Sequence, residues 1–217
     1  MDVLIWAVVG AALGWLAGHV ALLVPTGDWS RPSTFLLRLR TEWKIEHVLG
    51  APIGAVSIAL AYSLRSGWWD FLATSVFTLL LTSVLLVDLR HHLVYPVMPF
   101  LGFLSSLILN PIGGEVGFLS SLTAGAAAAG AFFALFLLGI LLFRVQALGF
   151  GDVLLALMIG GMAGLPLMPA ALFLGTIIGA VASLGLVILR RKSLNEYIPF
   201  GSGMCLAAII ILIARGG

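Results

Sequence analysis

Two aspartates stand out among the nine acidic residues of this 217-residue chain. Asp88 ends one apolar stretch, and Asp152 begins another directly after Gly149-Phe150-Gly151. Two carboxyl groups held about 3 Å apart share one proton, because both cannot ionise at that distance. One then acts as a base toward water and the other as an acid toward a carbonyl or a leaving amine. If the fold brings the two together, the sequence predicts hydrolysis of a peptide bond without a metal.

Each of these aspartates also has a plainer interpretation. Asp88 could form an ion pair with Arg90, or be a solvated charge at a helix end. Capping does not explain Asp88, since a carboxylate near a helix C-terminus opposes the helix dipole. Asp152 could simply cap the helix that it begins. The glycines on either side of Phe150 favour the functional interpretation, because they allow a second chain to lie close to the acid.

Other chemistries are less well supported. His91 and His92 follow Asp88, but no H-E-x-x-H sequence occurs and we expect no helix to continue there. Ser202 is not part of a G-x-S-x-G sequence, and the single cysteine, Cys205, excludes a multi-cysteine zinc site. We therefore expect no metal. Five further acids are expected to be solvated charges in loops or at chain ends: Asp2, Asp28, Asp70, Glu115 and Glu196.

The composition requires a membrane protein. Only 9% of the residues are charged and 61% are hydrophobic, whereas a soluble globular chain carries about 25% charged residues. So few charges exclude an ordinary soluble enzyme, and a net charge of +2 excludes a nucleic-acid binder. We predict an all-α, polytopic membrane protein, with residues 1–217 forming a single transmembrane helical domain.

A spanning helix needs about 20 mostly apolar residues. Eight stretches meet this requirement approximately: 3–24, 47–64, 69–87, 95–110, 117–143, 152–167, 169–189 and 198–214. The longest break between them, 25–46, is expected to be the first cytoplasmic loop. Glycines at four-residue spacing within the spans predict close helix packing: Gly10, Gly14 and Gly18, Gly50 and Gly54, Gly160 and Gly164, and Gly175 and Gly179.

The basic residues predict the orientation in the membrane. Alternate connections hold nine of them: Arg31, Arg38, Arg40, Lys44, Arg90, Arg144, Arg190, Arg191 and Lys192. The opposite side holds Arg65 and Arg215. Because cytoplasmic loops are enriched in lysine and arginine, both termini are expected outside. Asp88 and Asp152 are then expected at the cytoplasmic boundary, where ionisable groups are candidates for function.

Three ordered motifs resemble those of the type IV prepilin peptidases, the G-x-G-D intramembrane aspartic proteases. They are VDLRHHLVYP at 87–96, LGFGDV at 148–153 and IPFG at 198–201. The resemblance extends over about residues 46–214. It implies that Asp88 and Asp152 are catalytic, and that the protein lies in the cytoplasmic (inner) membrane. It further implies that the enzyme cuts the short basic leader from prepilins or pseudopilins at the cytoplasmic face.

The resemblance also implies supporting roles. Gly149, Phe150 and Gly151 are expected to shape the backbone around the second acid. Glu42 and Glu46 are the candidates for binding a basic leader. The partners are then the precursor proteins and the lipid bilayer, with no nucleic acid.

The same resemblance bears on cofactors. Bifunctional members of the family carry a four-cysteine zinc motif in the first cytoplasmic loop, whereas the loop at 25–46 contains no cysteine. No cofactor is therefore expected, and S-adenosylmethionine would be needed only if methyl transfer is retained. Pro199, Phe200 and Gly201 are expected to support a helix end.

Two alternatives remain open. The acids could relay protons in a proton-coupled transporter, although no internal repeat of the kind common in transporters is evident. The chain could also be a member of the resembled family that mainly binds or N-methylates pilins. That idea is motivated by the short loop and by Leu154, which stands where many members have a lysine.

Overall fold

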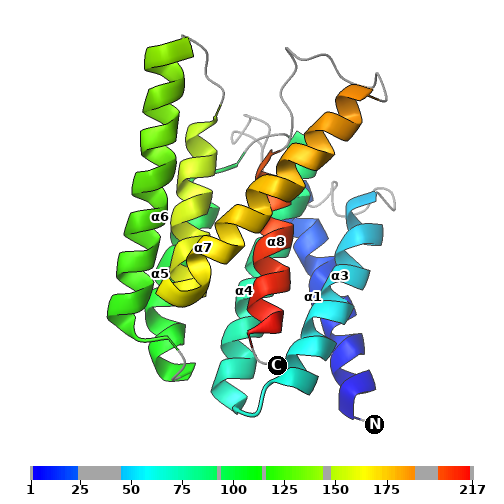
Figure 1. Cartoon of the computed structure of the whole chain (residues 1–217). Coiled ribbons are helices and arrows are strands. Elements are labelled where there is room, and N and C mark those ends of the chain that lie inside the picture. The colour runs from blue at the N-terminus through cyan, green and yellow to red at the C-terminus, as the bar shows by residue number, and fades with distance from the viewer. Residues whose placement is uncertain are drawn as a thin grey trace, which may run out of the picture.

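A computed structural model describes residues 2–23, 45–91, 94–113, 116–143, 148–188 and 200–215, and this part of the chain is helical without strands (Figure 1). The helices are α1 (Asp2–Leu23), α3 (Ile45–Leu64), α4 (Trp68–His91), α5 (Val97–Gly113), α6 (Phe118–Leu138), which continues into a π-helical turn (Gly139–Phe143), α7 (Phe150–Ile188) and α8 (Phe200–Ala214).

The apolar helices confirm an all-α polytopic membrane protein. Four of the described helices are long and apolar enough to cross a membrane, and three shorter ones are also apolar. α7 turns back on itself at Gly164, so it supplies two limbs that correspond to the predicted spans 152–167 and 169–189 (Figure 1). One boundary was wrong: α4 continues to His91, which puts Asp88 inside its last turn and not at its end.

α4 is the central helix of the bundle. It packs against α1, α3, α5 and α8, and its residues Leu81 to Asp88 are all buried. The main core joins α4 to α6, α7 and α8 through large side chains that include Phe77, Leu86, Phe132, Met158 and Leu212. Because α4 has protein on most sides, a polar side chain on it must find a partner within the bundle.

Glycines allow α1 and α3 to touch backbone to backbone. A Cβ atom added to Gly10 would lie 2.9 Å from the carbonyl carbon of Gly54, and one added to Gly14 would lie 2.9 Å from that of Gly50. Such contacts gain dispersion energy that larger residues would prevent, which matters because lipid supplies little hydrophobic drive for helix association. The packing role predicted for these four glycines is confirmed.

Gly164 packs closely, as expected, since an added Cβ would lie 2.7 Å from Val116 Cγ1, and it has a second role that was not expected. Its φ is 72° and its ψ is 172°, a conformation that residues with a Cβ rarely adopt. The residue that follows it, Leu165, donates its backbone N–H to the Ser120 hydroxyl at 3.0 Å and not to its own helix. Gly164 is therefore the turning point of α7, which four-residue spacing alone does not reveal.

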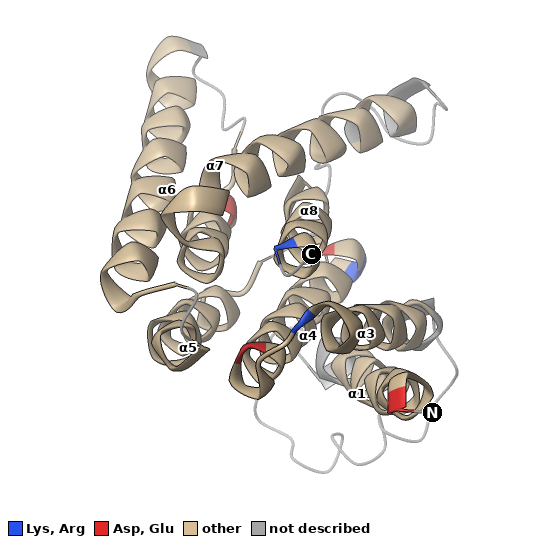
Figure 2. Ribbon diagram, turned by 60° about the horizontal axis from the view of Figure 1, so that its bottom comes forward, with Lys and Arg blue, Asp and Glu red and all other residues tan. Residues whose placement is uncertain are grey.

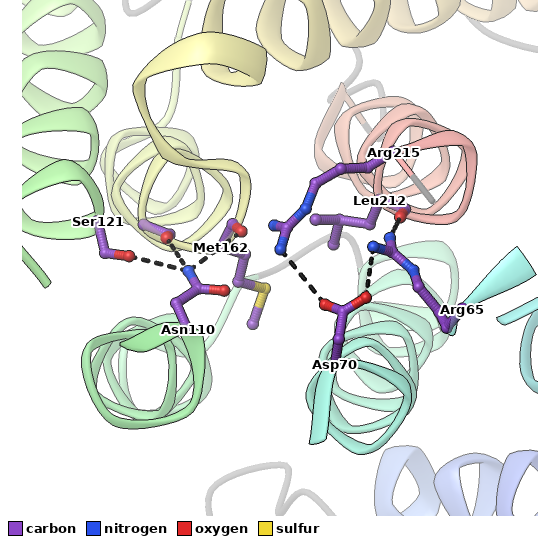
Figure 3. A network of polar contacts seen from close by, with 8 residues as sticks. Arg65, Asp70, Asn110, Ser121, Met162, Leu212 and Arg215 are labelled. Carbon is purple, nitrogen blue, oxygen red and sulfur yellow. Dashed lines mark hydrogen bonds and ion pairs between the residues drawn. The ribbon is translucent and has the colours of Figure 1, made fainter. Parts of the chain in front are cut away.

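Asn110 of α5 completes this turn. Leu165 and Pro166 would normally donate to Gly161 and Met162, but the first N–H is diverted and proline has none. Asn110 Nδ2 donates to both orphaned carbonyl oxygens, Gly161 O at 2.9 Å and Met162 O at 3.3 Å (Figure 3). The same nitrogen also lies 2.8 Å from the Ser121 hydroxyl of α6. The reversal of α7 is thus stabilised by side chains from two other helices.

Asp70 is not the solvated charge that the sequence suggested. It is only 5% exposed in the first turn of α4, and its Oδ2 pairs with Arg65 Nη1 at 2.6 Å. Its Oδ1 lies 3.4 Å from Arg215 Nη2, and Arg65 also donates to the carbonyl of Leu212 (Figure 3). This cluster ties the α3–α4 connection to the C-terminal end of α8.

The two ends of the bundle differ in what they hold. Both chain termini lie at the end that carries the Asp70 cluster (Figure 1). Charges are sparse on the ribbons and gather near helix ends (Figure 2). α4 runs away from this end and α7 starts at the other, so Asp88 and Asp152 share the end opposite the termini.

A matched pair of glycine substitutions tests the α1–α3 contact. Gly14→Ala should lower the free energy of unfolding by about 1–3 kcal/mol, because the methyl group meets the Gly50 backbone. Gly130→Ala, where nothing lies within 4 Å of the added Cβ, should be neutral or slightly stabilising. Thermal unfolding in detergent micelles measures both, and equal midpoints would contradict the contact.

Asn110→Ala tests the turn of α7. It should cost about 1–3 kcal/mol of unfolding free energy, because two buried carbonyl groups lose their donor. Ser105→Ala on the same helix is the control, since among the described residues that hydroxyl bonds only to Gly102 O of its own turn, at 2.7 Å. A loss from Asn110→Ala no larger than that from Ser105→Ala in the same unfolding measurement would show that the turn does not depend on Asn110.

Candidate active site

Asp88 lies in the last turn of α4 with its side chain fully buried, at 0% exposure. Its Oδ2 accepts a hydrogen bond from the backbone N–H of Ser202 at 2.6 Å. Ser202 is in the first turn of α8, where backbone N–H groups have no partner within the helix. A carboxylate also interacts favourably with the positive end of a helix dipole. Asp88 therefore caps a helix other than its own.

Asp152 is the third residue of α7 and is 2% exposed. Its Oδ2 accepts a hydrogen bond from Gly149 N–H at 3.1 Å, while its own N–H donates to Gly149 O at 3.0 Å. The side-chain bond is one half of a capping box, since Gly149 has no side chain to supply the other half, and it agrees with the plainer interpretation that Asp152 caps the start of its helix. The other carboxyl oxygen, Oδ1, is buried and finds no hydrogen-bond partner in the part of the chain that the structure describes. Capping alone does not account for that buried oxygen.

The first turn of α8 lies where α4 and α7 meet. An added Cβ on Gly201 would lie 3.3 Å from Asp88 Oδ2 and also 3.3 Å from Leu155 Cδ2, one turn beyond Asp152. The carboxyl groups of Asp88 and Asp152 lie near enough to influence each other electrostatically, and both lie near the buried Cys205 of α8. Two acids that lie 64 positions apart in sequence are therefore brought to one region of the bundle.

The residues around Asp152 are divided between the site and the surface. Gly149 supplies the cap, and an added Cβ on Gly151 would lie 2.9 Å from Val94 Cβ, in the segment that follows α4. Phe150 is 53% exposed, and its ring lies 6.3 Å from that of Phe136 on α6. The two glycines thus allow close approach at the acid, whereas Phe150 packs on the outside of the bundle.

Other predicted residues are only partly described. Glu42 and Pro199 lie outside the described residues, and Glu46 lies in the first turn of α3 without a described side chain. The sequence interpretation missed the contact of Gly201 and Ser202 with Asp88. The signal for it was present, because both follow directly after Pro199-Phe200 in the third motif.

The arrangement is suited to acid–base chemistry at a protected site. Buried carboxyl groups that interact with each other can divide the roles of proton donor and proton acceptor. Backbone N–H groups hold one oxygen of each acid, Ser202 N–H for Asp88 and Gly149 N–H for Asp152. Each side chain is thereby fixed in orientation, as a positioned acid or base requires.

Comparisons with known proteins agree with this site. The type IV leader peptidase family matches residues 75–184, a segment that contains both Asp88 and Asp152. The prepilin leader peptidase/N-methyltransferase of Aeromonas hydrophila is 28% identical over 158 residues, which are 73% of this chain and 54% of that relative. The protein of the same name from Pseudomonas aeruginosa is 28% identical over 170 residues, which are 72% of this chain and 57% of that relative.

A third relative of that name, from Aeromonas salmonicida (strain A449), is 27% identical over 158 residues. The chain spans about half the length of these curated relatives. No solved structure matches the chain. Because the family match covers half of the sequence and includes both buried acids, the chain belongs to the type IV leader peptidase family.

Proposed function

We propose that the protein is a membrane aspartic endopeptidase that removes the basic leader from type IV prepilin-like precursors. The observation that carries the proposal is the convergence of two buried acids, Asp88 from α4 and Asp152 from α7, at one end of an apolar bundle. Both acids lie within the segment that matches the leader peptidase family. The names of the relatives support the substrate class, a prepilin leader.

The proposed reaction divides two proton transfers between the acids. One carboxylate takes a proton from a water molecule as the water oxygen attacks the scissile carbonyl carbon, and the other carboxyl donates a proton to the carbonyl oxygen. As the C–N bond breaks, the leaving amine takes the proton that the first acid gained from water, and a hydroxyl of the tetrahedral intermediate returns a proton to the second acid, which restores both groups. Asp152 Oδ1 is available for this chemistry, since its partner oxygen is the one that binds Gly149.

The basic residues support an orientation with the acids at the cytoplasmic face of the inner membrane. In the sequence, nine of the eleven lysines and arginines fall between α1 and α3, in the last turn of α4, between α6 and α7, or between α7 and α8. Positive charge is enriched on cytoplasmic loops. The termini would then lie outside, and a precursor helix inserted in the bilayer would present its cytoplasmic leader junction to the two acids.

Methyl transfer is a separate activity that the relatives carry in their name. The proposed peptidase reaction uses no cofactor, and S-adenosylmethionine would be needed only for N-methylation of the cleaved product. Incubating that product with the wild-type protein and labelled S-adenosylmethionine tests whether this chain also transfers methyl groups.

Substitution of either acid by its amide tests the proposal. Asp88→Asn and Asp152→Asn preserve shape but cannot exchange the proton, so each should reduce leader cleavage by about 10²–10⁴-fold. The assay uses purified protein in detergent or liposomes and a prepilin-like peptide with a basic leader. Asp2→Asn is the matched control, because this exposed aspartate lies at the other end of the bundle.

The same assay separates the alternatives. Normal cleavage by either Asp88→Asn or Asp152→Asn would exclude the dyad. A wild-type protein that binds or methylates the peptide but never cuts it would indicate a pilin-binding or methylating member. Acid-dependent proton flux in sealed liposomes, without cleavage, would indicate the transporter.

We further propose that Glu42 and Glu46 bind the basic leader. Glu46→Lys should raise the KM for a leader rich in lysine and leave kcat nearly unchanged, because the substitution places like charges together without touching the acids. A peptide with glutamates in place of those lysines should reverse the effect. Glu115→Lys, predicted on the opposite side of the membrane, is the control, and an unchanged KM in Glu46→Lys would refute the role of Glu46.

A further inference from the structure

The start of α8 lies directly against the Asp88 carboxyl. Ser202 N–H donates to Asp88 Oδ2 at 2.6 Å, and an added Cβ on Gly201 would lie 3.3 Å from that oxygen and 3.4 Å from Asp88 Cγ. The same Cβ would lie 3.3 Å from Leu155 Cδ2. A methyl group at residue 201 would therefore require these neighbours to shift by a few tenths of an ångström.

We propose that Gly201 and the backbone N–H of Ser202 are positioning groups, which hold the Asp88 carboxyl in its working orientation toward Asp152. This inference rests on the proposed peptidase function and extends it to the third sequence motif. The N–H group fixes one carboxyl oxygen, and the missing side chain of Gly201 leaves room for the carboxyl to lie against the helix. Neither group contacts the substrate; both act through Asp88.

The position of α8 is itself fixed by backbone contacts with α7. An added Cβ on Gly203 would lie 2.6 Å from Gly179 N and 2.7 Å from Gly179 Cα, in the second limb of α7. An added Cβ on Gly175 would lie 3.0 Å from Met204 Cα. Because backbone supports α8 on this side, a methyl group at residue 201 would displace the softer neighbours, the Asp88 carboxyl and the Leu155 side chain.

The far end of α8 is held as well. Arg65 donates to the carbonyl of Leu212, and Arg215 lies 3.4 Å from Asp70. A helix held at both ends cannot move freely to relieve a clash at its first turn. We therefore expect a shift of a few tenths of an ångström at Asp88, where the rate is sensitive to small misplacements of the reacting groups.

Gly201→Ala tests this inference, with Gly113→Ala as the matched control. An added Cβ on Gly113 also faces a buried aspartate, Asp70, but at 3.5–3.8 Å and at the other end of the bundle. Gly201→Ala should lower kcat for leader cleavage about tenfold or more with little change in KM, because it disturbs a group used in the transition state. Gly113→Ala should retain both constants, and thermal unfolding should show both variants folded.

A second variant checks the steric cause. Leu155→Val removes the Cδ2 atom, which is the neighbour of residue 201 other than Asp88 that an added methyl group would meet. In a double-mutant cycle, Gly201→Ala should reduce kcat less in the Leu155→Val protein than in the wild type, because the methyl group gains room. If Gly201→Ala alone does not fold, the double variant compared with Leu155→Val still gives the kcat effect.

The outcomes distinguish this inference from the proposed function. A wild-type kcat in Gly201→Ala, a loss confined to KM, or an equal loss in Gly113→Ala would overturn the positioning role while Asp88→Asn remained inactive. Absence of coupling to Leu155→Val would also overturn it. Normal cleavage by Asp88→Asn would instead overturn the proposed dyad itself.

Discussion

The attachment of α8 to one face of α4 is the constraint on which the site depends. Asp70 and Asp88 lie 18 residues apart on α4, which is five helical turns, so they face the same direction about 27 Å apart. Asp88 accepts from the N-terminal turn of α8, and Asp70 pairs with Arg215, just beyond its C-terminal end. Arg65 adds a donor to the carbonyl of Leu212. An acid meets the positive end of α8 and a cation meets its negative end, as the helix dipole favours.

The buried carboxylates at the two ends of the bundle, Asp70 and Asp152, are compensated in different ways. A buried carboxylate is costly unless charges or hydrogen bonds compensate it. Asp70 has two arginines, a strong and inert arrangement that removes it from chemistry. At the other end, Asp152 receives a single backbone N–H while its Oδ1 stays buried without a hydrogen bond among the described residues. That difference distinguishes the structural acid from the candidate catalytic acid better than burial does, since both are buried.

The sequence predicted the helices well but not the contacts between them. Hydropathy located the apolar spans because the bilayer requires about 20 such residues, and residue type alone identified Asp88 and Asp152 as candidates. Asp70 was misjudged because its partners lie 5 and 145 positions away, and no local pattern encodes such pairing. The turn at Gly164 was missed because this residue shares the four-residue spacing of a packing glycine. A side chain from α5 stabilises the turn, and no local pattern reveals that contact.

The turn at Gly164 lies at the end of the bundle opposite the two acids, but it affects where both acids are placed. The first limb of α7 carries Asp152, and the second limb carries Gly179, which packs against α8 close to the Asp88 contact. Because α7 reverses direction, one helix carries both Asp152 and the glycine that packs against α8 near Asp88. Asn110 stabilises that reversal by donating hydrogen bonds to the carbonyl oxygens of Gly161 and Met162. The separation of the two acids is consequently set by packing at the opposite end of the bundle as well as by the residues beside them.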